Sequence, residues 1–375
     1  MKTQPGRPTV AEIDLAALGA NYRTLKAIAN GAEVMAIVKA DAYGHGAVEV
    51  ARALASHGCC HFGVATVEEA RELRNASVRE RIYVMGGFFP AQASEIVALD
   101  LTPFVFDLLS IRALDKAAHE QSRKGFKVHL KIDSGATRLG MQPEELESAV
   151  PELKQAQSLQ LEGVCTILAN AGDPSSPTND QQLKVFASAL ERLKAGGFAP
   201  GVVHVANSAA LVLRPDSHFN MVRPGLAIYG LPPVRAMRET VELCPVMTFK
   251  TRVLQTRHVP AGTGVSYGYT FVTTRPSVIG VLPVGYADGY RRGLQHGGEV
   301  LIRGRRAPVV GAVCMDLTMI DLTDVPAAAP GDEVILWGGS GEETISVNDV
   351  ARLAQTISYE MLSTVGKRVP RIYRS

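Results

Sequence analysis

Short apolar runs alternate with amphipathic stretches through the first two-thirds of the chain. Apolar runs of this kind occupy positions 34–38, 61–65, 82–85, 101–105, 128–132, 161–166 and 202–205. Between them, apolar residues recur at helical spacing within 48–56, 68–74, 108–119 and 181–193. This alternation is typical of βα units around a parallel sheet. About eight such units in roughly 240 residues favour a closed (β/α)8 barrel. An open doubly wound sheet is the alternative, because periodicity does not show closure.

The pattern changes after residues 231–233, Leu-Pro-Pro. From there, β-branched runs separated by Gly and Pro turns predict a mainly-β second domain. These runs lie at 247–259, 277–284, 299–302, 307–310, 318–322 and 333–336. One helix is expected over 347–355, with Ser346 as N-cap and Asp349 completing a capping box. We therefore expect a barrel over 1–240, a linker around 231–244 and a β-rich domain over 241–375.

Composition narrows the class of protein. The 375 residues include 39 Lys and Arg against 37 Asp and Glu, and this near-balance argues against a dedicated nucleic-acid or membrane-surface binder. Apolar residues make up 46%, which excludes disorder. No apolar run approaches the roughly 18 residues of a membrane span, and residues 1–14 are too polar for a secretory signal. Five cysteines without CxxC spacing imply no disulfide framework. We expect a cytoplasmic globular protein without a metal, nucleic-acid or membrane partner.

Lys39 is the first candidate for chemistry. It follows the first predicted barrel strand and precedes a turn that contains Gly44 and Gly46. Barrel active sites lie at the carboxyl ends of the strands. A lysine partly buried there has a lowered pKa and becomes nucleophilic, which suits a Schiff base with an aldehyde. The alternative is a lysine that extends its amine from a strand end into solvent, and position alone does not decide between the two.

Eight short motifs follow one another along almost the whole chain. They lie at 37–46, 129–140, 206–209, 220–230, 265–268, 285–289, 314–316 and 356–360. Taken together and in this order, they closely resemble the motifs of the alanine racemases, pyridoxal-phosphate enzymes with a barrel and a β domain. One such motif would be weak evidence, whereas eight collinear motifs are strong evidence.

The resemblance implies that Lys39 holds pyridoxal 5'-phosphate as a Schiff base. Racemisation removes a proton from one face of a planar carbanion and returns it to the other, so two groups on opposite sides are expected. In the family these are the lysine, which serves the D-enantiomer, and the tyrosine of Val-Ser-Tyr-Gly, here Tyr267, which serves the L-enantiomer. A tyrosine pKa near 10 suits a base poorly, so a nearby cation is expected. By motif alone, Tyr267 is equally well a strand-end aromatic residue.

The resemblance places Arg223 against the ring nitrogen of the cofactor. A guanidinium cannot accept the proton of the ring, so the nitrogen stays neutral and the ring is a weaker electron sink. A weak sink keeps the carbanion short-lived and limits transamination. We expect His204 to support Arg223; the alternative for His204 is an ordinary strand histidine with its hydrogen bonds satisfied.

The remaining contacts are also carried by the resemblance. The phosphate is expected to bind Tyr43, Ser208, Tyr359 and the main chain of Gly225 and Leu226. Arg138 is expected at the phenolic oxygen of the cofactor and at the substrate carboxylate. Tyr286 and the backbone N–H of Met315 complete the substrate contacts.

Lys131 matches a lysine that carries a carbamate in many members of the family. A carbamate would convert repulsion of Arg138 into pairing. An ordinary lysine paired with Asp133 is the competing picture.

Three positions depart from the family pattern. Ile167 stands where the family usually has a histidine beside the ring, Gly172 replaces an acidic residue, and Ala312 replaces an arginine. In the family, the last two positions line the access corridor. We hypothesise that a charged gate is missing and that serine or larger amino acids are turned over at rates comparable with alanine. Neutral drift with compensation elsewhere is the alternative.

The predicted activity is interconversion of L- and D-alanine for peptidoglycan synthesis. The alternatives are a related racemase of broader or different specificity and a non-catalytic carrier of pyridoxal phosphate; a decarboxylase is disfavoured because its cysteine motif is missing. Lys39 and Tyr267 fall in different predicted domains. As in the family, we expect a homodimer with shared sites, to which the opposite subunit contributes Tyr267, Tyr286 and Met315.

Overall fold

The structure is a computed structural model that describes residues 6–340 and 343–375. Its chain divides into two compact units. The barrel unit contains Leu18–Ala42 and Ala47–Cys244, and the β unit contains residues up to Ala17, Tyr43–Gly46 and Pro245–Ser375. The N-terminal segment, which the division at residue 240 grouped with the barrel, belongs to the β unit because its strand β1 (Val10–Asp14) pairs with strands of that unit.

Eight parallel strands close into a barrel, as the alternating pattern predicted, and the open sheet is excluded. The strands are β2 (Glu33–Ile37), β3 (His61–Val64), β4 (Arg81–Val84), β5 (Thr102–Val105), β6 (Phe126–Lys131), β7 (Leu159–Cys165), β8 (Val202–Asn207) and β9 (Met221–Arg223). Closure is made by β2 and β9, where Val34 pairs with Val222.

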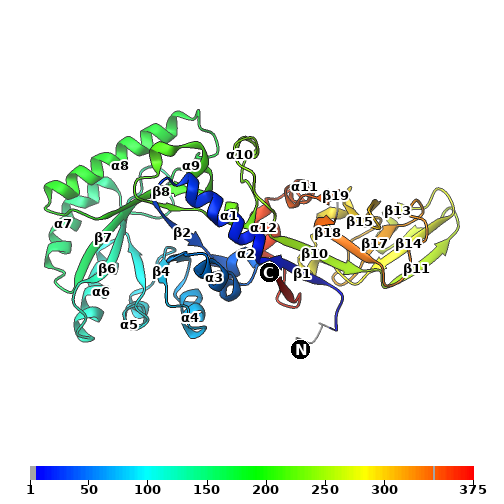
Figure 1. The fold of residues 1–375 in the computed structure, drawn as a ribbon, viewed down its shortest axis with the longest axis horizontal. Coiled ribbons are helices and arrows are strands. Elements are labelled where there is room, and N and C mark those ends of the chain that lie inside the picture. Colours follow the sequence, from blue (N-terminus) through cyan, green and yellow to red (C-terminus); the bar gives the residue numbers. More distant parts are fainter. Residues whose placement is uncertain (1–5, 341–342) are drawn as a thin grey trace. The chain divides into compact units, whose positions relative to one another are not determined.

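Helices cover the outside of these strands (Figure 1). They are α1 (Leu15–Ile28), α3 (Ala47–Ser56), α4 (Val67–Asn75), α5 (Ala93–Ala98), α6 (Leu108–Glu120), α7 (Leu146–Gln155), α8 (Pro177–Ala195) and α9 (Ser208–Leu213). Helix α4 shows why such segments form. Thr66 and Glu69 make a capping box at its start, and its buried residues recur three positions apart, so one face packs while the other stays polar.

One register shift in the barrel matters for its interior. Along the β6–β7 pair, Val128 is opposite Leu161 but His129 is opposite Gly163, so Glu162 is an extra residue in β7. Such a bulge re-aims a side chain. Here Glu162 reaches the buried ring of His129.

The described residues of the β unit form three sheets. The largest has the order β16-β15-β18-β10-β1-β20 with β19 beside β18, and the others are β11-β14-β17 and β12-β13. Their bounds are β10 (Met247–Arg252), β11 (Gln255–Val259), β12 (Gly264–Val265), β13 (Phe271–Val272), β14 (Ser277–Leu282), β15 (Glu299–Ile302), β16 (Arg305–Pro308), β17 (Thr318–Asp321), β18 (Glu333–Ser340), β19 (Glu343–Ile345) and β20 (Arg371–Arg374).

Three further helices lie after the barrel strands: α10 (Arg235–Arg238), α11 (Val347–Leu353) and α12 (Ser358–Ser363). Helix α10 falls inside the segment expected to be a linker. In α11 the predicted N-cap is confirmed, because the Ser346 hydroxyl accepts from Asn348 N–H at 3.2 Å. The predicted capping box is wrong, since the Asp349 carboxylate instead accepts from Arg352 in the next turn.

Candidate functional site

Lys39 begins a left-handed turn directly after β2. The turn, α2 (Lys39–Gly44), has φ angles of 52° to 53° at four consecutive non-glycine residues, Ala40 through Tyr43. Such a conformation costs roughly 1–2 kcal/mol per residue. Hydrogen bonds hold it in place: Ala42 N–H donates to Val38 O at 2.8 Å, and Ala40 N–H donates to the Glu69 carboxylate at 2.6 Å. A strained segment fixed this firmly is typical of a functional site.

The environment of Lys39 favours its neutral amine. The side chain is half-buried. Its pKa lies below the ordinary lysine value because burial penalises the charge and because the Arg138 guanidinium repels it, with Glu69 acting in the opposite direction. A larger neutral fraction makes the amine a better nucleophile and proton acceptor.

Lys131, at the end of β6, is a second amine with a lowered pKa. Burial is the main cause; Cys165 acts in the opposite direction, and the charges of Arg223, Arg138 and Lys39 each lower the pKa further. Within residues 6–340 and 343–375, no hydrogen bond or ion pair engages the Lys131 amine.

The expected alternative, a pair between Lys131 and Asp133, is wrong. The Asp133 carboxylate accepts the backbone N–H groups of Gly135, Ala136, Thr137 and Arg138 at 2.8–3.2 Å. Burial raises the pKa of Asp133, but these four donors together lower it below the ordinary value. Asp133 thus shapes the loop that carries Arg138 instead of compensating the lysine.

Arg223 ends β9 and is buried. One terminal nitrogen donates to His204 Nδ1 at 2.6 Å and His204 O at 2.8 Å, and the other donates to the carbonyls of Thr166 and Val205 at 2.6 and 3.1 Å. These bonds use four of its five N–H groups. In the described part of the chain, only its Nε–H is left to donate to a ligand. The predicted support of Arg223 by His204 is present.

Ser208, at the start of α9, sits beside the turn at Gly225. Its hydroxyl accepts the Gly225 N–H at 2.9 Å and the Ala227 N–H at 3.3 Å. The Gly225 N–H that was expected to bind phosphate is therefore already engaged, and Leu226 follows it at the start of a short helical turn. In the β unit, the rings of Tyr43 and Tyr359 meet with centroids 5.9 Å apart, so two of the expected phosphate-binding phenols come together there.

Tyr267, Tyr286 and Met315 lie around one cavity of the β unit. The cavity has a volume of about 880 Å³ and is also lined by Ala312 and Asp316. Tyr267 is 78% exposed and Met315 is 52% exposed. Exposed apolar groups gathered in one place mark a surface that binds something.

Backbone contacts fix the loops around this cavity. The Ser266 hydroxyl donates to Ala312 O at 2.8 Å and contacts the Cys314 sulfur. Gly311, with φ 69°, is required at this approach, because a Cβ atom there would lie 2.6 Å from Val265 O. The Tyr267 loop is thereby held against the loop that carries Met315.

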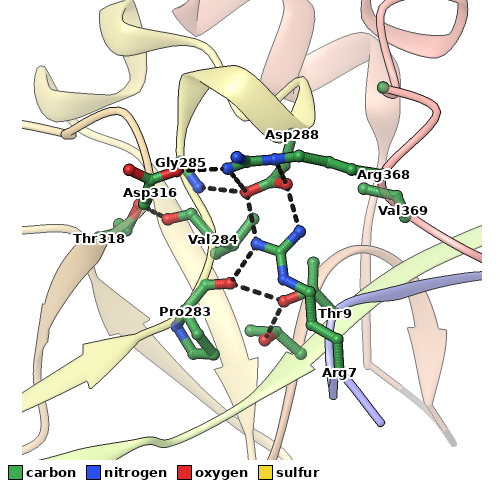
Figure 2. Close-up of polar contacts among 12 residues, drawn as sticks. Arg7, Thr9, Pro283, Val284, Gly285, Asp288, Asp316, Thr318, Arg368 and Val369 are labelled. Carbon is green, nitrogen blue, oxygen red and sulfur yellow. Dashed lines mark hydrogen bonds and ion pairs between the residues drawn. The ribbon is translucent and has the colours of Figure 1, made fainter. Parts of the chain in front are cut away.

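The β unit also contains a buried carboxylate, Asp288, which Figure 2 shows between Arg7 and Arg368. It accepts from Arg7 at 2.6 and 2.8 Å, from Arg368 at 2.7 and 3.2 Å, and from Gly285 N–H at 3.0 Å. Burial raises the pKa of Asp288, but the two guanidiniums bring it below the ordinary value. Arg368 also binds Asp316 at 2.6 Å. The network therefore anchors the turn that carries Tyr286 and the residue next to Met315.

The structure thus gathers the expected residues in separate sets. The barrel unit holds one group of Lys39, Lys131, Arg138, His204 and Arg223 and another of Ser208 with Gly225 and Leu226; the β unit holds Tyr43 with Tyr359, and Tyr267 with Tyr286 and Met315. Sequence reasoning missed the role of Asp288 and its two arginines, and it missed Glu162 with His129. Glu162 did carry a signal, since it is a charged residue inside an apolar run.

The structure shows what surrounds each of the three residues that depart from the family pattern. Ile167 O accepts from the Gln182 amide at 3.0 Å. At Gly172, an added Cβ would lie 2.6 Å from Val234 Cγ1, so a larger side chain requires Val234 to move. Ala312 is buried against the Tyr267 loop.

Across residues 6–340 and 343–375, no group of three or more His, Cys, Asp or Glu side chains is arranged to hold a metal ion. None of the helices described is long and apolar enough to cross a membrane.

Fold and site together define the class: a (β/α)8 barrel with a lysine at a strand end and a basic mouth, followed by a mainly-β unit. Models of the N-terminal and C-terminal domains of alanine racemase match residues 13–233 and 246–373. The chain belongs to the alanine racemase family, which confirms the resemblance.

Individual relatives cover nearly the whole chain. The alanine racemase of Symbiobacterium thermophilum is 44% identical, with 98% of this chain and 97% of that protein aligned. Among solved structures, alanine racemase from Streptomyces lavendulae gives a TM-score of 0.94 at 36% identity, covering 99% and 98% of the two chains. Alanine racemase from Bartonella henselae, solved with covalently bound pyridoxal phosphate, gives 0.89 at 33% identity, covering 98% and 99%.

Proposed function

We propose that the protein interconverts L- and D-alanine with pyridoxal 5'-phosphate held through Lys39. In this proposal it works in the cytoplasm and supplies D-alanine for peptidoglycan. The observation that carries it is a group of four basic side chains: Lys39 just after β2, Lys131 at the end of β6, Arg138 in the loop after β6 and Arg223 at the end of β9. None of the four is paired with a carboxylate among the residues described. Such a cluster fits a ligand that carries both phosphate and carboxylate groups.

The residues present fit the cofactor. The Lys39 amine, with its lowered pKa, suits bond formation with an aldehyde, and Arg223 keeps one N–H for a ring nitrogen. When bound, pyridoxal phosphate withdraws electrons from the α-carbon and makes its hydrogen acidic.

Two residues exchange the α-proton in this proposal. The Lys39 amine holds the proton that belongs to the D-enantiomer, and the Tyr267 phenol holds the proton of the L-enantiomer. Two groups are required because one base cannot easily serve both faces of a planar centre.

Arg223 limits side reactions. Because a guanidinium donates and never accepts, a ring nitrogen bound by its Nε–H keeps its lone pair and stays unprotonated. The weaker electron sink favours return of the proton over transamination.

The phosphate is assigned to Tyr43, Tyr359, Ser208 and the main chain at Gly225 and Leu226. The paired rings of Tyr43 and Tyr359 and the hydroxyl of Ser208 beside Gly225 support this assignment. Because the Gly225 N–H already donates to Ser208, the Ser208 hydroxyl is oriented toward its own donation to an anion.

Lys131 is proposed to carry a carbamate. Its neutral amine attacks carbon dioxide, a nitrogen–carbon bond forms, and one proton leaves, so the side chain becomes an anion. Burial, the lowered pKa and the missing partner support this. The anion would pair with Arg138, which is assigned to the substrate carboxylate. Carbon-13 bicarbonate should give a carbamate resonance that is absent in Lys131→Met.

A homodimer is proposed, in which the partner subunit contributes Tyr267, Tyr286 and Met315 to each site. The high exposure of Tyr267 and Met315 around one cavity supports a surface that needs a cover. Sedimentation that shows a fully active monomer would contradict it.

A broader racemase is the second candidate. Ala312 lines the 880 Å³ cavity without charge, and Gly172 leaves no side chain at the other departing position. Serine and larger amino acids are then expected to react at rates comparable with alanine, and a panel in which only alanine is efficient would remove this candidate.

The central test combines borohydride trapping with exchange of α-deuterium. Reduction should fix the cofactor on the peptide that contains Lys39. Lys39→Ala should lose exchange, and Tyr267→Phe should lose exchange into one enantiomer only. Retained exchange into both enantiomers in Tyr267→Phe would refute the two-base assignment, and no exchange with any amino acid despite bound cofactor would indicate a non-catalytic carrier.

A further inference from the structure

A line of polar side chains runs through the barrel interior from Arg223 to Glu162. His204 Nδ1 contacts the Arg223 guanidinium at 2.6 Å, and His204 Nε2 contacts His129 Nδ1 at 2.8 Å. His129 Nε2 contacts the Glu162 carboxylate at 3.3 Å. Both histidines are fully buried, and barrel interiors are ordinarily filled by branched apolar side chains. Such a line needs a reason, because buried polar groups are costly unless every one is satisfied.

The two ends of the line fix every proton within it. Arg223 can only donate, so His204 Nδ1 must accept. A neutral His204 then carries its hydrogen on Nε2 and donates it to His129 Nδ1. His129 in turn carries its hydrogen on Nε2 and donates it to the Glu162 carboxylate, which can only accept when ionised. All donors therefore point from Arg223 toward Glu162.

No other protonation state keeps the three bonds. A second proton on His204 would sit on Nδ1 and face an Arg223 N–H, and two donors cannot form a hydrogen bond with each other. A second proton on His129 would sit on Nδ1 and face the Nε2–H of His204, so the bond between the two histidines would be lost. Burial lowers the pKa of both histidines, and the charge of Arg223 adds to this. At His129 the bond to Glu162 and its charge act in the opposite direction, but the pKa still lies below the ordinary value, which agrees with two neutral rings.

The strand geometry is built for this line. Glu162 is the extra residue of the β7 bulge. The next residue, Gly163, leaves room for the histidine, since a Cβ there would lie 2.5 Å from His129 Cε1. Phe104 stacks on His129 with centroids 5.7 Å apart and also contacts His204, and the Tyr83 ring meets the His129 ring edge-on. These rings hold the two imidazoles in place.

The far end of the line is held as an anion. Glu162 binds Arg81 at 2.8 and 2.9 Å and Lys127 at 2.9 Å. Burial raises the pKa of Glu162, but the bonds to His129, Lys127 and Arg81 together bring it far below the ordinary value. The negative charge thus stays on Glu162 at any pH near neutrality.

We infer that Glu162 and His129 are positioning residues for Arg223, acting through His204 so that one guanidinium N–H is kept aimed at the ring nitrogen of the cofactor. The inference rests on the proposed function for its catalytic consequence, but the direction of the line does not. The line supplies an acceptor for Arg223 without placing a carboxylate beside it. A carboxylate at that position would pair with the guanidinium and reduce its positive charge.

The first test reads the protons directly. Protein with nitrogen-15 in its histidine rings should show two neutral Nε2–H imidazoles that do not titrate between about pH 5.5 and 9. In His129→Phe, the His204 resonances should move, because Nε2–H loses its acceptor. In Glu162→Gln, both tautomers should persist, since the amide oxygen still accepts. An Nδ1–H tautomer or a titrating ring in the unsubstituted protein would overturn the inference.

The second test reads kinetics. His129→Phe keeps the stacking ring and should lower kcat about 100-fold, as expected for a misplaced catalytic group, with KM for alanine changed less than about twofold. Glu162→Gln should lower kcat about tenfold through the lost charge. Tyr83→Phe keeps the ring that contacts His129 and should leave kcat unchanged. Lys127→Gln removes one ion pair of Glu162 but leaves the bidentate pair with Arg81, so it should lower kcat much less than Glu162→Gln.

The outcomes of these tests distinguish a failure of the inference about Glu162 and His129 from a failure of the proposed function. If His129→Phe does not fold, Glu162→Gln decides, and wild-type kcat in that variant overturns the inference. A fall in kcat equal to that of Lys127→Gln also overturns it, because this would indicate only the loss of an ion pair. Neutral Nε2–H tautomers in a protein inactive toward all amino acids would uphold the line and reject the proposed function.

Discussion

In the barrel unit, Lys39, Lys131, Arg138 and Arg223 gather without a carboxylate partner, whereas in the β unit the carboxylate of Asp288 lies between two arginines. The β unit therefore satisfies its buried charge internally. The barrel unit leaves positive charge available: Asp133 binds only backbone N–H groups, and the Glu162 carboxylate is separated from Arg223 by two imidazoles. Compensated charge stabilises a fold, while uncompensated charge selects a ligand. The buried charges of the β unit thus stabilise its fold, whereas those of the barrel unit are available to bind a ligand.

Of the substitutions that test this comparison, leaving their controls aside, removal of the compensated anion should have the largest effect on stability. Asp288→Asn leaves Arg7 and Arg368 opposite a neutral amide and should lower the free energy of unfolding by about 3 kcal/mol, a moderate value because both arginines are partly exposed. Chemical denaturation of this variant measures the loss. Asp349→Asn, at an exposed pair with Arg352, is the control and should change stability by less than about 0.5 kcal/mol.

The same carboxylate predicts a pH dependence. The folded pKa of Asp288 lies below its unfolded value, so its contribution to stability is present above the unfolded pKa of about 3.9 and is lost as the pH falls through the folded pKa. Asp288→Asn should therefore unfold with a flatter dependence on pH in the acid range. An unchanged dependence would contradict the assignment of this network.

Overpacking the barrel interior should have the next largest effect. Gly163→Ala places a methyl group against the His129 ring and should cost about 2 kcal/mol of unfolding free energy. Gly201→Ala, which adds a methyl group to open space, is the matched control and should cost less than about 0.5 kcal/mol. Equal stability of the two variants would show that the interior is loosely packed.

In the strained turn after Lys39, a substitution should stabilise the protein, whereas the substitutions above destabilise it. Ala40→Gly should raise the unfolding free energy by up to about 1 kcal/mol, because glycine adopts a φ of 52° without the penalty of a Cβ atom. Ala53→Gly, in the right-handed helix α3, should lower it by a similar amount. Destabilisation by both substitutions would reject the left-handed turn.

The smallest effect on stability is expected at the exposed face of the β unit. Tyr267→Ala should change the unfolding free energy of that unit by less than about 0.5 kcal/mol, because its side chain is 78% exposed. Tyr290→Ala, buried in the same unit, should cost about 3 kcal/mol or more. A large effect at Tyr267 would show that it serves the fold and would weaken its assignment as a proton carrier.

Much of the fold could be read from the chain because buried parallel strands are continuous apolar runs. Strand β9 could not, since its three residues are too few to form such a run. Helix α7 contains Pro151, which interrupts a helical pattern, and β20 begins and ends with arginine. Each of these elements is defined by its neighbours in the folded chain.

The candidate site divides in the same way. Lys39, Arg223 and Tyr267 lie in local motifs and were predicted from them. The ion pair between Arg7 and Asp288 joins residues 281 positions apart, and a local sequence pattern cannot predict such a pair. The role of Glu162 depends on the register between β6 and β7, which a single strand does not contain.

The bulge in β7 makes the length of that strand as important as its composition. A substitution at Glu162 would remove an acceptor and leave the ladder bent. Loss of the residue itself would straighten the ladder and remove the acceptor in one event. We therefore expect related proteins that keep the β7 bulge to change the side chain at position 162 more readily than the number of residues in β7. An insertion or deletion in β7 would then identify the relatives that have lost the line from Arg223 to Glu162.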